Sequence, residues 1–459
     1  MMRQTYLALD VGTTNVKAAV VTSSGDIIRQ QSCPVPVSTF SEYMEADARE
    51  LLETVLGLIR ELRVDHSVGA MALSCQMAGL VVLDNQGKAL FPIILGIDRR
   101  GEAYLGDLNR LLGMDQIYGQ TGCPAQGTYW PGKWLWLKEK YPRTVVQAAF
   151  IMGIKEYLLL QLCGRWDCDY VTASATQVFS QPLGSWWPEM MGALDLHKEQ
   201  LPTLGNPSDC LGRVRPSIRK RLNLSENMTV LLGAGDGLIS SLASDALQPG
   251  DLCVSMGTTV VTRYLTSQFL PKVGENAFYQ RIDGVSYLKG ERVSLAGRRI
   301  ECMRVRAQGR EEPVEQAYYW RGELHGVEKL NAAQQLRALL EGILFDLFHT
   351  HGSMVADGKI RRICCSGGGS ANSSWMQAMA NLFQIPVVVF EDHEILRGLA
   401  AIFQQYENPS MPLLGWRPRT VGRVYRPQID SGLTQRYHQY AAHMLDNAKG
   451  DGENGTGIG

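Results

Sequence analysis

The sequence predicts an α/β fold with two domains, each a mixed sheet flanked by helices. Strand-like segments come first in adjacent pairs and only later alternate with helical segments, which is not the pattern of a purely parallel sheet. The strand-turn-strand segment "LALDVGTTNVKAAVV" at residues 7–21 has an echo in "LCVSMGTTVVTRYL" at residues 252–265. The second half of the chain thus opens like the first, which indicates two domains of similar construction.

The elements of the first half follow from apolar spacing and turn residues. Asp47 and Glu50 form a capping pattern, which predicts the start of a helix, and Asn85-Gln86-Gly87 is typical of the turn of a hairpin. The predicted elements are strands at 5–12, on both sides of a Ser-Gly-Asp turn within 16–35 and at 68–74, a helix at 46–62, and a hairpin at 79–94.

The later part of the chain is richer in helix and aromatic residues between about 100 and 220, and the strand pattern restarts near 230. A long helix is predicted at 331–351, and a strand, a glycine loop, a helix and a strand within 359–390. We expect a first domain at 1–235, a second at 236–445, and a polar, Gly-rich, disordered tail at 446–459.

Composition excludes several classes of protein. The 459 residues are 45% hydrophobic and 20% charged with a net charge of −1, which does not favour binding to nucleic acid or to a membrane surface. No apolar run is long enough to span a bilayer. The first residues enter a strand at once, so we expect no signal peptide and a cytoplasmic protein.

The ten cysteines are scattered and form no CxxC pair, so we expect reduced, mostly buried thiols. A metal site made of cysteine or histidine is not expected. His349 and His351 are expected to end a helix rather than to bind zinc.

The first Gly-Thr-Thr turn carries groups that suit a metal-bound phosphate. Gly12 allows a tight turn, Thr13 and Thr14 offer hydroxyl and N–H donors, and Lys17 adds a positive charge. Asp10 could hold Mg²⁺ through water. A plain β-hairpin turn is the alternative interpretation.

The second turn, Gly257-Thr258-Thr259, lacks the aspartate and the lysine of the first but can still present hydrogen-bond donors. Two such hairpins could grip a polyphosphate. The sequence contains no G-x-x-x-x-G-K-[ST] string, which excludes a P-loop.

Two further glycine-rich segments follow strands. Asp236 lies between glycines, where it could accept a proton from a hydroxyl during phosphoryl transfer or cap a helix at 238–247. Gly367, Gly368 and Gly369 could lie against a planar or phosphate-bearing ligand, and Asn372 could bind a base or cap the helix that follows.

In their order along the chain, these segments resemble the FGGY family of carbohydrate kinases, most closely its xylulokinase branch. The resemblance covers nearly the whole chain, including "CQMAGLVVLDNQGKAL", "KWLWLKEKYP", "DYVTASATQVF" and "GAGDGLISSLASDALQPGDLCVSMGTT". It implies two domains of the actin and hexokinase type, which share the ribonuclease H-like fold, with ATP and sugar in the cleft between them.

The resemblance also implies roles for individual residues. Asp236 would be the catalytic base, and Asp10 the carboxylate on the side of the Mg²⁺ ion. Met77, Ala78 and Asp98, together with Asp236, fall where the family binds the sugar. The implied ATP-binding residues are Thr13, Thr14, Asn15, Lys17, Gly257, Thr258, Thr259, Gly367, Gly368, Gly369 and Asn372.

The chain departs from the family at the sugar side. Ala78 stands where similar xylulokinases have His, and Gly96 and Ile97 stand where the family has Trp and Asn. A lost hydrogen bond to a sugar costs about 0.5–1.5 kcal/mol, and the loss of Trp should open space, so a different or larger sugar is expected.

The predicted function is ATP-dependent phosphorylation of a sugar or polyol, with ATP and Mg²⁺ as cofactors and a small-molecule partner. The alternative is a catalytically weak or inactive nucleotide-binding regulator derived from such a kinase. The sequence leaves open the acceptor, the hydroxyl that is phosphorylated, and whether the chain forms a homodimer.

Overall fold

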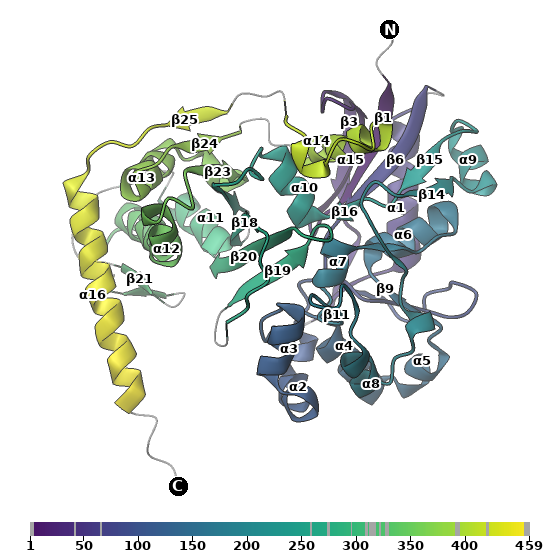
Figure 1. Ribbon diagram of the computed structural model, residues 1–459, viewed down its shortest axis with the longest axis horizontal. Coiled ribbons are helices and arrows are strands. Elements are labelled where there is room, and N and C mark those ends of the chain that lie inside the picture. Colours follow the sequence, from purple (N-terminus) through teal and green to yellow (C-terminus); the bar gives the residue numbers. More distant parts are fainter. Residues whose placement is uncertain are drawn as a thin grey trace. The chain divides into compact units, whose positions relative to one another are not determined.

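The computed structural model (Figure 1) divides the chain into two compact units. The first comprises Met1–Asp245, Leu265–Lys289 and Glu394–Arg419, and the second Ala246–Tyr264, Gly290–His393 and Thr420–Gly459. The structure describes residues 4–40, 43–64, 67–257, 259–272, 276–294, 296–307, 311, 318–320, 323–325, 330–390, 395–418 and 422–453.

A mixed sheet forms the centre of the first unit, with the strand order β14-β15-β6-β1-β2-β3. β1 pairs in parallel with β6 and antiparallel with β2, so the sheet is mixed, as predicted. β16 pairs with β6 beside β15. The strands are β1 (Thr5–Val11), β2 (Asn15–Thr22), β3 (Ile27–Pro34), β6 (Val68–Cys75), β14 (Cys210–Arg213), β15 (Thr229–Leu231) and β16 (Ala234–Gly235).

Helix α1 (Ala48–Glu61) begins as predicted, because the Asp47 side chain accepts a hydrogen bond from the N–H of Glu50 at 2.8 Å. Its apolar stripe shares a core with alternate residues of β1, including Leu7 and Leu9. Each fully buried leucine contributes about 1.5–3 kcal/mol, so this face holds the helix on the sheet.

The segment from 394 to 419 returns to the first unit from far along the sequence. It contains α14 (Ile395–Gly398), α15 (Ala400–Glu407) and η4 (Leu413–Gly415). Phe403 stacks on Tyr6 of β1, with ring centroids 4.4 Å apart, and the Tyr6 hydroxyl donates to Glu407. The indole N–H of Trp416 donates to the carbonyl of Ser23 at 3.2 Å.

A helical region with a tryptophan-rich core follows the first strands of this unit, as its composition predicted. The helices between residues 100 and 243 are η1 (Arg100–Tyr104), α2 (Leu105–Leu112), α3 (Met114–Thr121), α4 (Trp130–Lys140), α5 (Pro142–Gln147), α6 (Ile154–Cys163), α7 (Tyr170–Ser174), α8 (Pro188–Leu194), η2 (Lys198–Gln200), α9 (Pro216–Leu222) and α10 (Asp236–Ala243). Of these, α6 and α9 pack in the core of the central sheet. The short strands of this unit are β4 (Val37–Phe40), β5 (Tyr43–Ala46), β7 (Val81–Leu83), β8 (Ile93–Ile94), β9 (Phe150–Met152), β10 (Cys168–Asp169), β11 (Phe179–Ser180), β12 (Ser185–Trp186) and β13 (Leu204–Gly205).

The predicted hairpin at 79–94 is present as a short antiparallel pairing. The N–H of Gly87 donates to the carbonyl of Asp84 at 3.0 Å in the turn, and the N–H of Leu90 donates to the carbonyl of Val82 at 2.9 Å across it. Leu80 and Ile94 also bridge the two arms. Each arm has a second partner as well, since β7 pairs with β9, and β8 pairs with β5.

A second mixed sheet forms the second unit, in the order β18-β17-β23-β24-β25. β17 pairs antiparallel with β18 and in parallel with β23, so the pairing of β1 with β2 and β6 is repeated. Helices α12 and α13 share its core (Figure 1). The strands are β17 (Asp251–Met256), β18 (Val260–Thr266), β23 (Arg362–Ser366), β24 (Val387–Val389) and β25 (Arg423–Tyr425).

The remaining elements are β19 (Ala277–Arg281), β20 (Tyr287–Ser294), β21 (Tyr318–Trp320), β22 (Glu323–His325), α11 (Ala296–Arg306), α12 (Ala332–Ala356), η3 (Gly368–Ala371), α13 (Ser373–Phe383) and α16 (Ser431–Glu453). His349 and His351 lie within α12, which continues to Ala356, and His351 Nε2 lies 3.0 Å from the Thr262 hydroxyl. The domain limits at 235 and 445 and the disorder of residues 446–459 stay predictions, although α16 reaches Glu453.

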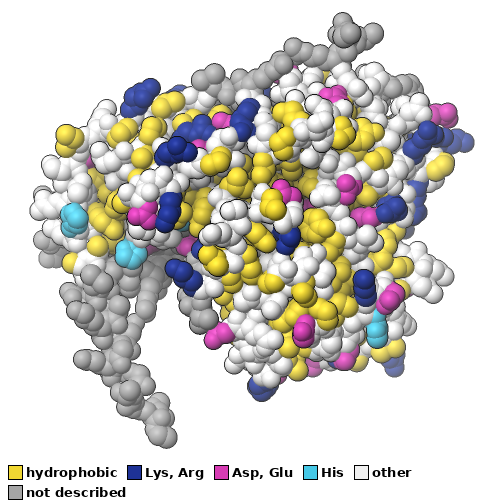
Figure 2. Space-filling model, viewed as in Figure 1, with side chains coloured by type: hydrophobic (Ala, Val, Ile, Leu, Met, Phe, Trp, Pro, Cys, Tyr) yellow, Lys and Arg dark blue, Asp and Glu magenta, His cyan; other side chains and the backbone are white. Residues whose placement is uncertain are grey.

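On the face that Figure 2 shows, basic and acidic side chains are interspersed, which agrees with the small net charge of the chain. None of the helices in the described ranges has the length and apolar character needed to cross a bilayer.

Gly233 is a backbone constraint in the first unit. Its φ of +74° lies in the left-handed region, and an added Cβ would collide with the carbonyl of Leu73 in β6. We therefore expect Gly233→Ala to destabilise the protein by about 1–3 kcal/mol or more, measured as a lower urea midpoint of unfolding.

Gly57 provides the matched control, because it lies inside α1 with open space around its Cα. Gly57→Ala should raise stability by about 0.5–1 kcal/mol, as alanine does in helix interiors. Equal unfolding midpoints for the two variants would contradict the constraint at Gly233.

Candidate functional site

Three neighbouring strand ends bring predicted residues of the first unit together. β6 pairs in parallel with both β1 and β16, so that Asp10 lies opposite Ser74, and Gly235 opposite Cys75. Asp10 and Asp236 therefore lie at the carboxyl ends of two parallel strands, one on each side of β6. This edge is where ligands bind in open α/β sheets.

The first Gly-Thr-Thr turn joins β1 to β2. The N–H of Gly12 donates to the carbonyl of Asn15 at 3.0 Å, and Gln76 Nε2 donates to the carbonyl of Gly12 at 2.8 Å. The turn is thus held from β6 as well as from its own hairpin. Gln76 was not among the predicted site residues, although it directly precedes Met77.

The side chains at the tip of this turn face solvent, since Thr13, Thr14 and Asn15 are all exposed. Behind them Asp10 is only 5% exposed, and it lies opposite Lys17 in the antiparallel register. The turn therefore offers hydroxyl and amide groups outward, with a carboxylate and an ammonium group at its base.

Asp236 is the first residue of α10 and is half-buried. Gly235 holds the N-cap position, so the expectation that Asp236 caps a helix at 238–247 is wrong. The helix starts two residues earlier than expected because the chain turns directly from β16 into it. A carboxylate in the first turn interacts favourably with the helix dipole.

A buried ion network lies beneath this edge. Lys155 Nζ is 3.1 Å from Glu156 Oε1 and 3.2 Å from Asp169 Oδ2, and it donates to the carbonyl of Leu232 at 3.2 Å. Burial lowers the pKa of Lys155, but the two carboxylates outweigh it and raise this pKa above its usual value. The network thus ties the strand before Gly233 to α6 and α7.

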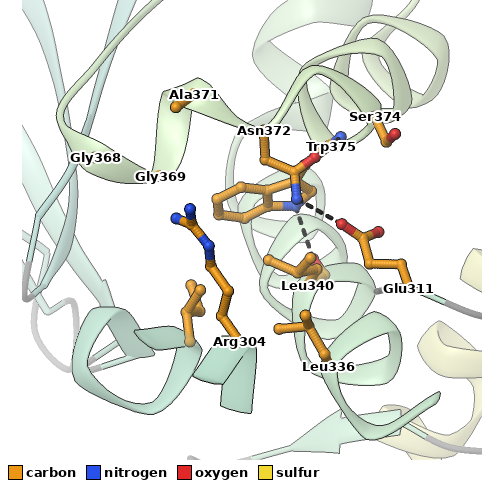
Figure 3. A pocket seen from close by; sticks show the side chains of 11 residues that line it. Arg304, Glu311, Leu336, Leu340, Gly368, Gly369, Ala371, Asn372, Ser374 and Trp375 are labelled. Atoms are coloured by element: carbon orange, nitrogen blue, oxygen red, sulfur yellow. Dashed lines mark hydrogen bonds between the residues drawn. The ribbon is translucent and has the colours of Figure 1, made fainter. Parts of the chain in front are cut away.

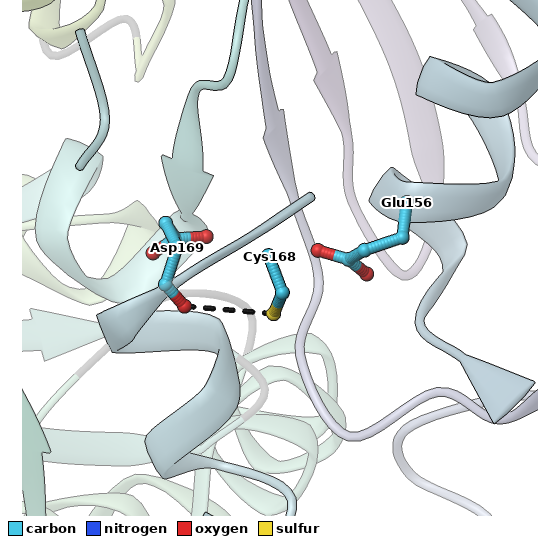
Figure 4. Close-up of side chains that lie close together, drawn as sticks. All are labelled: Glu156, Cys168 and Asp169. Carbon is cyan, nitrogen blue, oxygen red and sulfur yellow. Dashed lines mark hydrogen bonds between the residues drawn. The ribbon is translucent and has the colours of Figure 1, made fainter. Parts of the chain in front are cut away.

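Figure 4 shows Glu156, Cys168 and Asp169 of this network, whose ligand atoms are close enough together to hold a metal ion. The Lys155 ammonium already supplies a positive charge to both carboxylates. Asp169 also caps α7 by accepting from the N–H groups of Val171 and Thr172. These contacts favour a structural ion network at this place.

Lys133 joins the two segments that were expected to contact a sugar. Its side chain is fully buried in α4, and Nζ donates to the carbonyls of Ala78 at 2.8 Å and Leu95 at 2.9 Å. Ala78 has a φ of +61°, a left-handed conformation that costs a non-glycine residue roughly 1–2 kcal/mol. The hydrogen bond from Lys133 helps to hold this strained backbone.

Asp98 is buried and already has several protein partners. Its carboxylate accepts from the Arg100 N–H at 2.9 Å, from Arg100 Nε at 2.8 Å and Nη2 at 2.9 Å, and from the N–H of Met44 at 2.7 Å. Burial raises the pKa of Asp98, but these hydrogen bonds outweigh it and leave the pKa below its usual value. Arg100 also pairs with Glu45 at 2.8 Å and stacks on Trp136.

The space expected at Gly96 is filled by the backbone of Met77, because an added Cβ at Gly96 would collide with the Met77 carbonyl oxygen. Ile97 beside it is 49% exposed. The close approach of these two segments explains why a large side chain is absent at position 96.

The second unit repeats the arrangement of strand ends. Ser255 in β17 lies opposite Ser366 in β23, so the second Gly-Thr-Thr turn and the glycine loop begin at the same edge. The N–H of Gly257 donates to the carbonyl of Thr259 at 3.2 Å. Thr258 lies outside the described residues.

Gly367 allows the glycine loop to turn at this edge. Its φ is +87°, and an added Cβ would lie 2.6 Å from the carbonyl oxygen of Met256. The backbone therefore passes directly over the end of β17 before it enters η3.

Asn372 is the N-cap of α13, which was one of its two expected roles. Its Oδ1 accepts from the N–H of Trp375 at 3.0 Å, and its Nδ2 donates to Glu311 Oε1 at 2.6 Å. The Trp375 indole in turn donates to the carbonyl of Leu340 at 2.9 Å.

A pocket of about 310 Å³ opens beside this helix start. Figure 3 shows Arg304 and Glu311 on opposite sides of the Trp375 indole, with the glycine loop above. The lining combines an apolar floor with a few charged and amide groups, which is typical of small-molecule pockets. Its residues are Ile300, Arg304, Glu311, Leu336, Leu340, Gly368, Gly369, Ala371, Asn372, Ser374 and Trp375.

Sequence reasoning missed Lys133, Arg100, Arg304 and Glu311. A lysine between tryptophans in "WPGKWLW" is a usable signal for a buried ammonium group. Arg304 and Glu311 left no comparable signal, since both stand in a charged stretch that resembles a solvated surface.

Lys133 makes the stability of the protein depend on pH. Burial lowers its pKa from 10.5 to about 7, so between these pH values the unfolded chain binds more protons than the folded one. Relative to Lys133→Met, wild-type stability should therefore rise from pH 7 to pH 10, by up to about 1.4 kcal/mol per pH unit. Urea unfolding across this range measures the difference.

Lys138 lies in the same helix but is exposed, and it pairs with Asp195, so Lys138→Met is the control. The stability difference between Lys138→Met and the wild type gives the baseline for the loss of an exposed lysine. A pH-independent difference for Lys133→Met would contradict the lowered pKa.

Comparisons with known proteins agree with this architecture. A family model for the "FGGY family of carbohydrate kinases, N-terminal domain" matches residues 5–243, and the C-terminal domain model of the same family matches residues 318–402. The chain is 23% identical to a gluconokinase of Bacillus subtilis (strain 168), over 95% of this chain and 94% of that protein. It is 26% identical to a xylulose kinase of Lactococcus lactis subsp. lactis (strain IL1403), over 83% of each.

The crystal structure of a gluconate kinase from Lactobacillus acidophilus matches with a TM-score of 0.88 at 22% identity, covering 96% of this chain and 98% of that one. This likeness confirms the predicted fold class of two sheet-based α/β domains. The N-terminal family model alone spans more than half of the sequence. The chain therefore belongs to the FGGY family of carbohydrate kinases and is an enzyme of the phosphotransferase class.

Proposed function

We propose that the protein transfers the γ-phosphoryl group of ATP to a hydroxyl of a sugar or polyol, with Asp236 as the general base. The observation that carries this proposal is the placement of Asp236 at the strand edge where Asp10 and the first Gly-Thr-Thr turn also lie. A half-buried carboxylate at a helix start can accept the hydroxyl proton as the new O–P bond forms.

The phosphate side of the proposal uses the two turns. Thr13, Thr14, Asn15 and Lys17 would hold phosphate oxygens from the first unit, and Gly257, Thr258 and Thr259 from the second. Asp10 suits a Mg²⁺ ion that is bound through water, because its carboxylate lies at the base of a turn whose side chains carry oxygen atoms. When bound, Mg²⁺ would neutralise charge on the phosphates.

The adenosine part of ATP would occupy the pocket beside α13. Gly367, Gly368 and Gly369 offer backbone groups along one wall, and Asn372 holds Glu311 in the pocket lining. The Glu311 carboxylate accepts hydrogen bonds, as a partner for an exocyclic amino group would have to do.

The acceptor would lie at Met77 and Ala78, next to Asp236. Both carboxylate oxygens of Asp98 already accept hydrogen bonds from Arg100 and from the N–H of Met44. Asp98 would therefore act on the acceptor mainly indirectly, through these groups. The relatives named above are a gluconokinase and a xylulose kinase, so sugar acids and ketoses are the acceptors to test first. The identity of the acceptor stays open, as do the homodimer and the cytoplasmic location.

The alternative of a nucleotide-binding regulator is not favoured. The relatives that match over most of the chain are named as kinases, including an L-fuculokinase of Escherichia coli (strain K12). The site residues that a kinase requires, Asp10, Lys17 and Asp236, also remain in this sequence.

Asp236→Asn tests the base directly. Release of ADP from ATP and Mg²⁺ is measured with a panel that includes D-xylulose, gluconate and glycerol. With the best acceptor, the variant should lower kcat by about 10²–10⁴-fold while ATP still binds, because only the proton acceptor is lost.

Asp195→Asn is the control, since Asp195 is an exposed aspartate in a left-handed conformation that asparagine tolerates. Its turnover should match the wild type. Unchanged turnover of Asp236→Asn would remove Asp236 from the mechanism, and a wild type that phosphorylates nothing in a broad panel would refute the kinase proposal.

Asn372→Asp tests the nucleotide pocket. The new carboxylate keeps the N-cap acceptor but faces Glu311 with a like charge and without the N–H donor. We expect the Kd for ATP to rise about tenfold or more while α13 stays folded, as measured by calorimetry and circular dichroism.

Asn331→Asp is the matched control, because Asn331 caps α12 in the same way and is not part of the pocket lining. It should leave the Kd for ATP unchanged. An equal effect of both substitutions would show that helix capping, and not the pocket, governs nucleotide affinity.

A further inference from the structure

The backbone of β19 is held firmly in the first unit on both sides of Gln280. The N–H of Tyr279 donates to the carbonyl of Gly122 at 3.0 Å, and the N–H of Arg281 donates to the Ser174 hydroxyl at 2.9 Å. The Tyr118 hydroxyl also donates to the carbonyl of Ala277 at 2.9 Å. The direction of the Gln280 side chain is therefore set by the fold.

The amide of Gln280 is poorly satisfied for a buried polar group. The residue is 5% exposed, and its Nε2 lies 3.5 Å from the sulfur of Met77, a weak acceptor. Its Oε1 is buried and has no hydrogen-bond partner among the described residues. A buried amide oxygen without a donor is costly, so such a group calls for an explanation.

The Met77 side chain lies close both to this amide and to the strand edge that carries Asp236. An added Cβ on Gly235 would overlap the side chain of Met77, so the thioether lies against the residue that precedes Asp236. The Met77 thioether thus lies close both to the Gln280 amide and to Gly235 before the start of α10. An unbranched thioether adopts other rotamers easily and can move aside for a ligand.

Gln181 differs from Gln280 in the partners of its nitrogen. Its Oε1 is also buried without a hydrogen-bond partner among the described residues, but its Nε2 donates to two backbone carbonyls, those of Thr121 at 3.2 Å and Tyr279 at 3.0 Å. Gln280 donates to no backbone carbonyl in the described part of the chain. Its amide is aimed at the Met77 side chain and does not hold the fold together.

We propose that Gln280 is an acceptor-binding residue: when the sugar or polyol displaces the Met77 thioether, Gln280 Oε1 accepts a hydrogen bond from a hydroxyl that is not phosphorylated. The proposal rests on the proposed function and deepens it. Because a carbonyl oxygen accepts from O–H groups, Gln280 Oε1 pairs with a hydroxyl of the acceptor at this position.

The experiment uses Gln280→Met, which keeps the length of the side chain and removes the amide, together with Gln181→Met as the structural control. The acceptor that binds most tightly in a panel including D-xylulose, gluconate and glycerol is then compared with its monodeoxy analogues. Binding is measured by calorimetry without nucleotide and, where turnover occurs, as kcat/KM.

We expect Gln280→Met to weaken binding of the parent acceptor by about 5- to 150-fold, the effect of leaving a buried hydroxyl without its partner. For one monodeoxy analogue the wild type and Gln280→Met should bind equally, because the hydroxyl that meets Gln280 is missing. Gln181→Met should change the affinity for every analogue by the same factor.

An equal loss for all analogues in Gln280→Met, or no loss at all, would overturn the proposal. If the wild type binds a carbohydrate but does not phosphorylate it, the proposed function is refuted. The affinities of the wild type and of Gln280→Met for that carbohydrate and its analogues then still test the role of Gln280. A wild type that binds no carbohydrate of the panel would overturn both.

Discussion

The parallel pairing of β6 with β1 and β16 is the constraint on which the first unit depends. This pairing fixes the register of Asp10 and Asp236, which lie far apart in the sequence: Asp10 lies opposite Ser74 of β6, and Asp236 directly follows Gly235, which lies opposite Cys75. The absence of a side chain at Gly233 permits the approach, since a Cβ there would collide with Leu73. The second unit repeats this arrangement: β17 pairs in parallel with β23, and Gly367 lets the backbone pass close to Met256 at the end of β17.

Two buried lysines bind backbone carbonyl groups close to this strand edge. Lys155 lies between two carboxylates and the carbonyl of Leu232, whereas Lys133 binds only carbonyl groups and has its pKa lowered to about 7. The difference follows from their partners, because carboxylates offset the cost of burying an ammonium group more fully than carbonyls do. Both lysines hold backbone next to the site, and neither reaches the solvent.

Local signals predicted the local parts of this structure. Asp47 and Glu50 marked the start of α1 correctly, and the Gly-Thr-Thr echo indicated the repeated strand pairing. Contacts distant in sequence could not be predicted: β7 also pairs with β9, and Lys133 binds a carbonyl 55 residues away. At Asn372 the residue type allowed two roles, and only the position of the helix start identified the cap.

The return of residues 394–419 to the first unit has a consequence for how the chain acquires its shape during synthesis. Phe403 stacks on Tyr6, and the Trp416 indole donates to the carbonyl of Ser23, so each contact joins residues that the ribosome makes at very different times. Domains generally fold from the N-terminus as the chain emerges, but the first unit is incomplete until residues 394–419 have been made. The face of β1 that carries Tyr6 therefore lacks its final cover while the parts of the second unit at Ala246–Tyr264 and Gly290–His393 are translated.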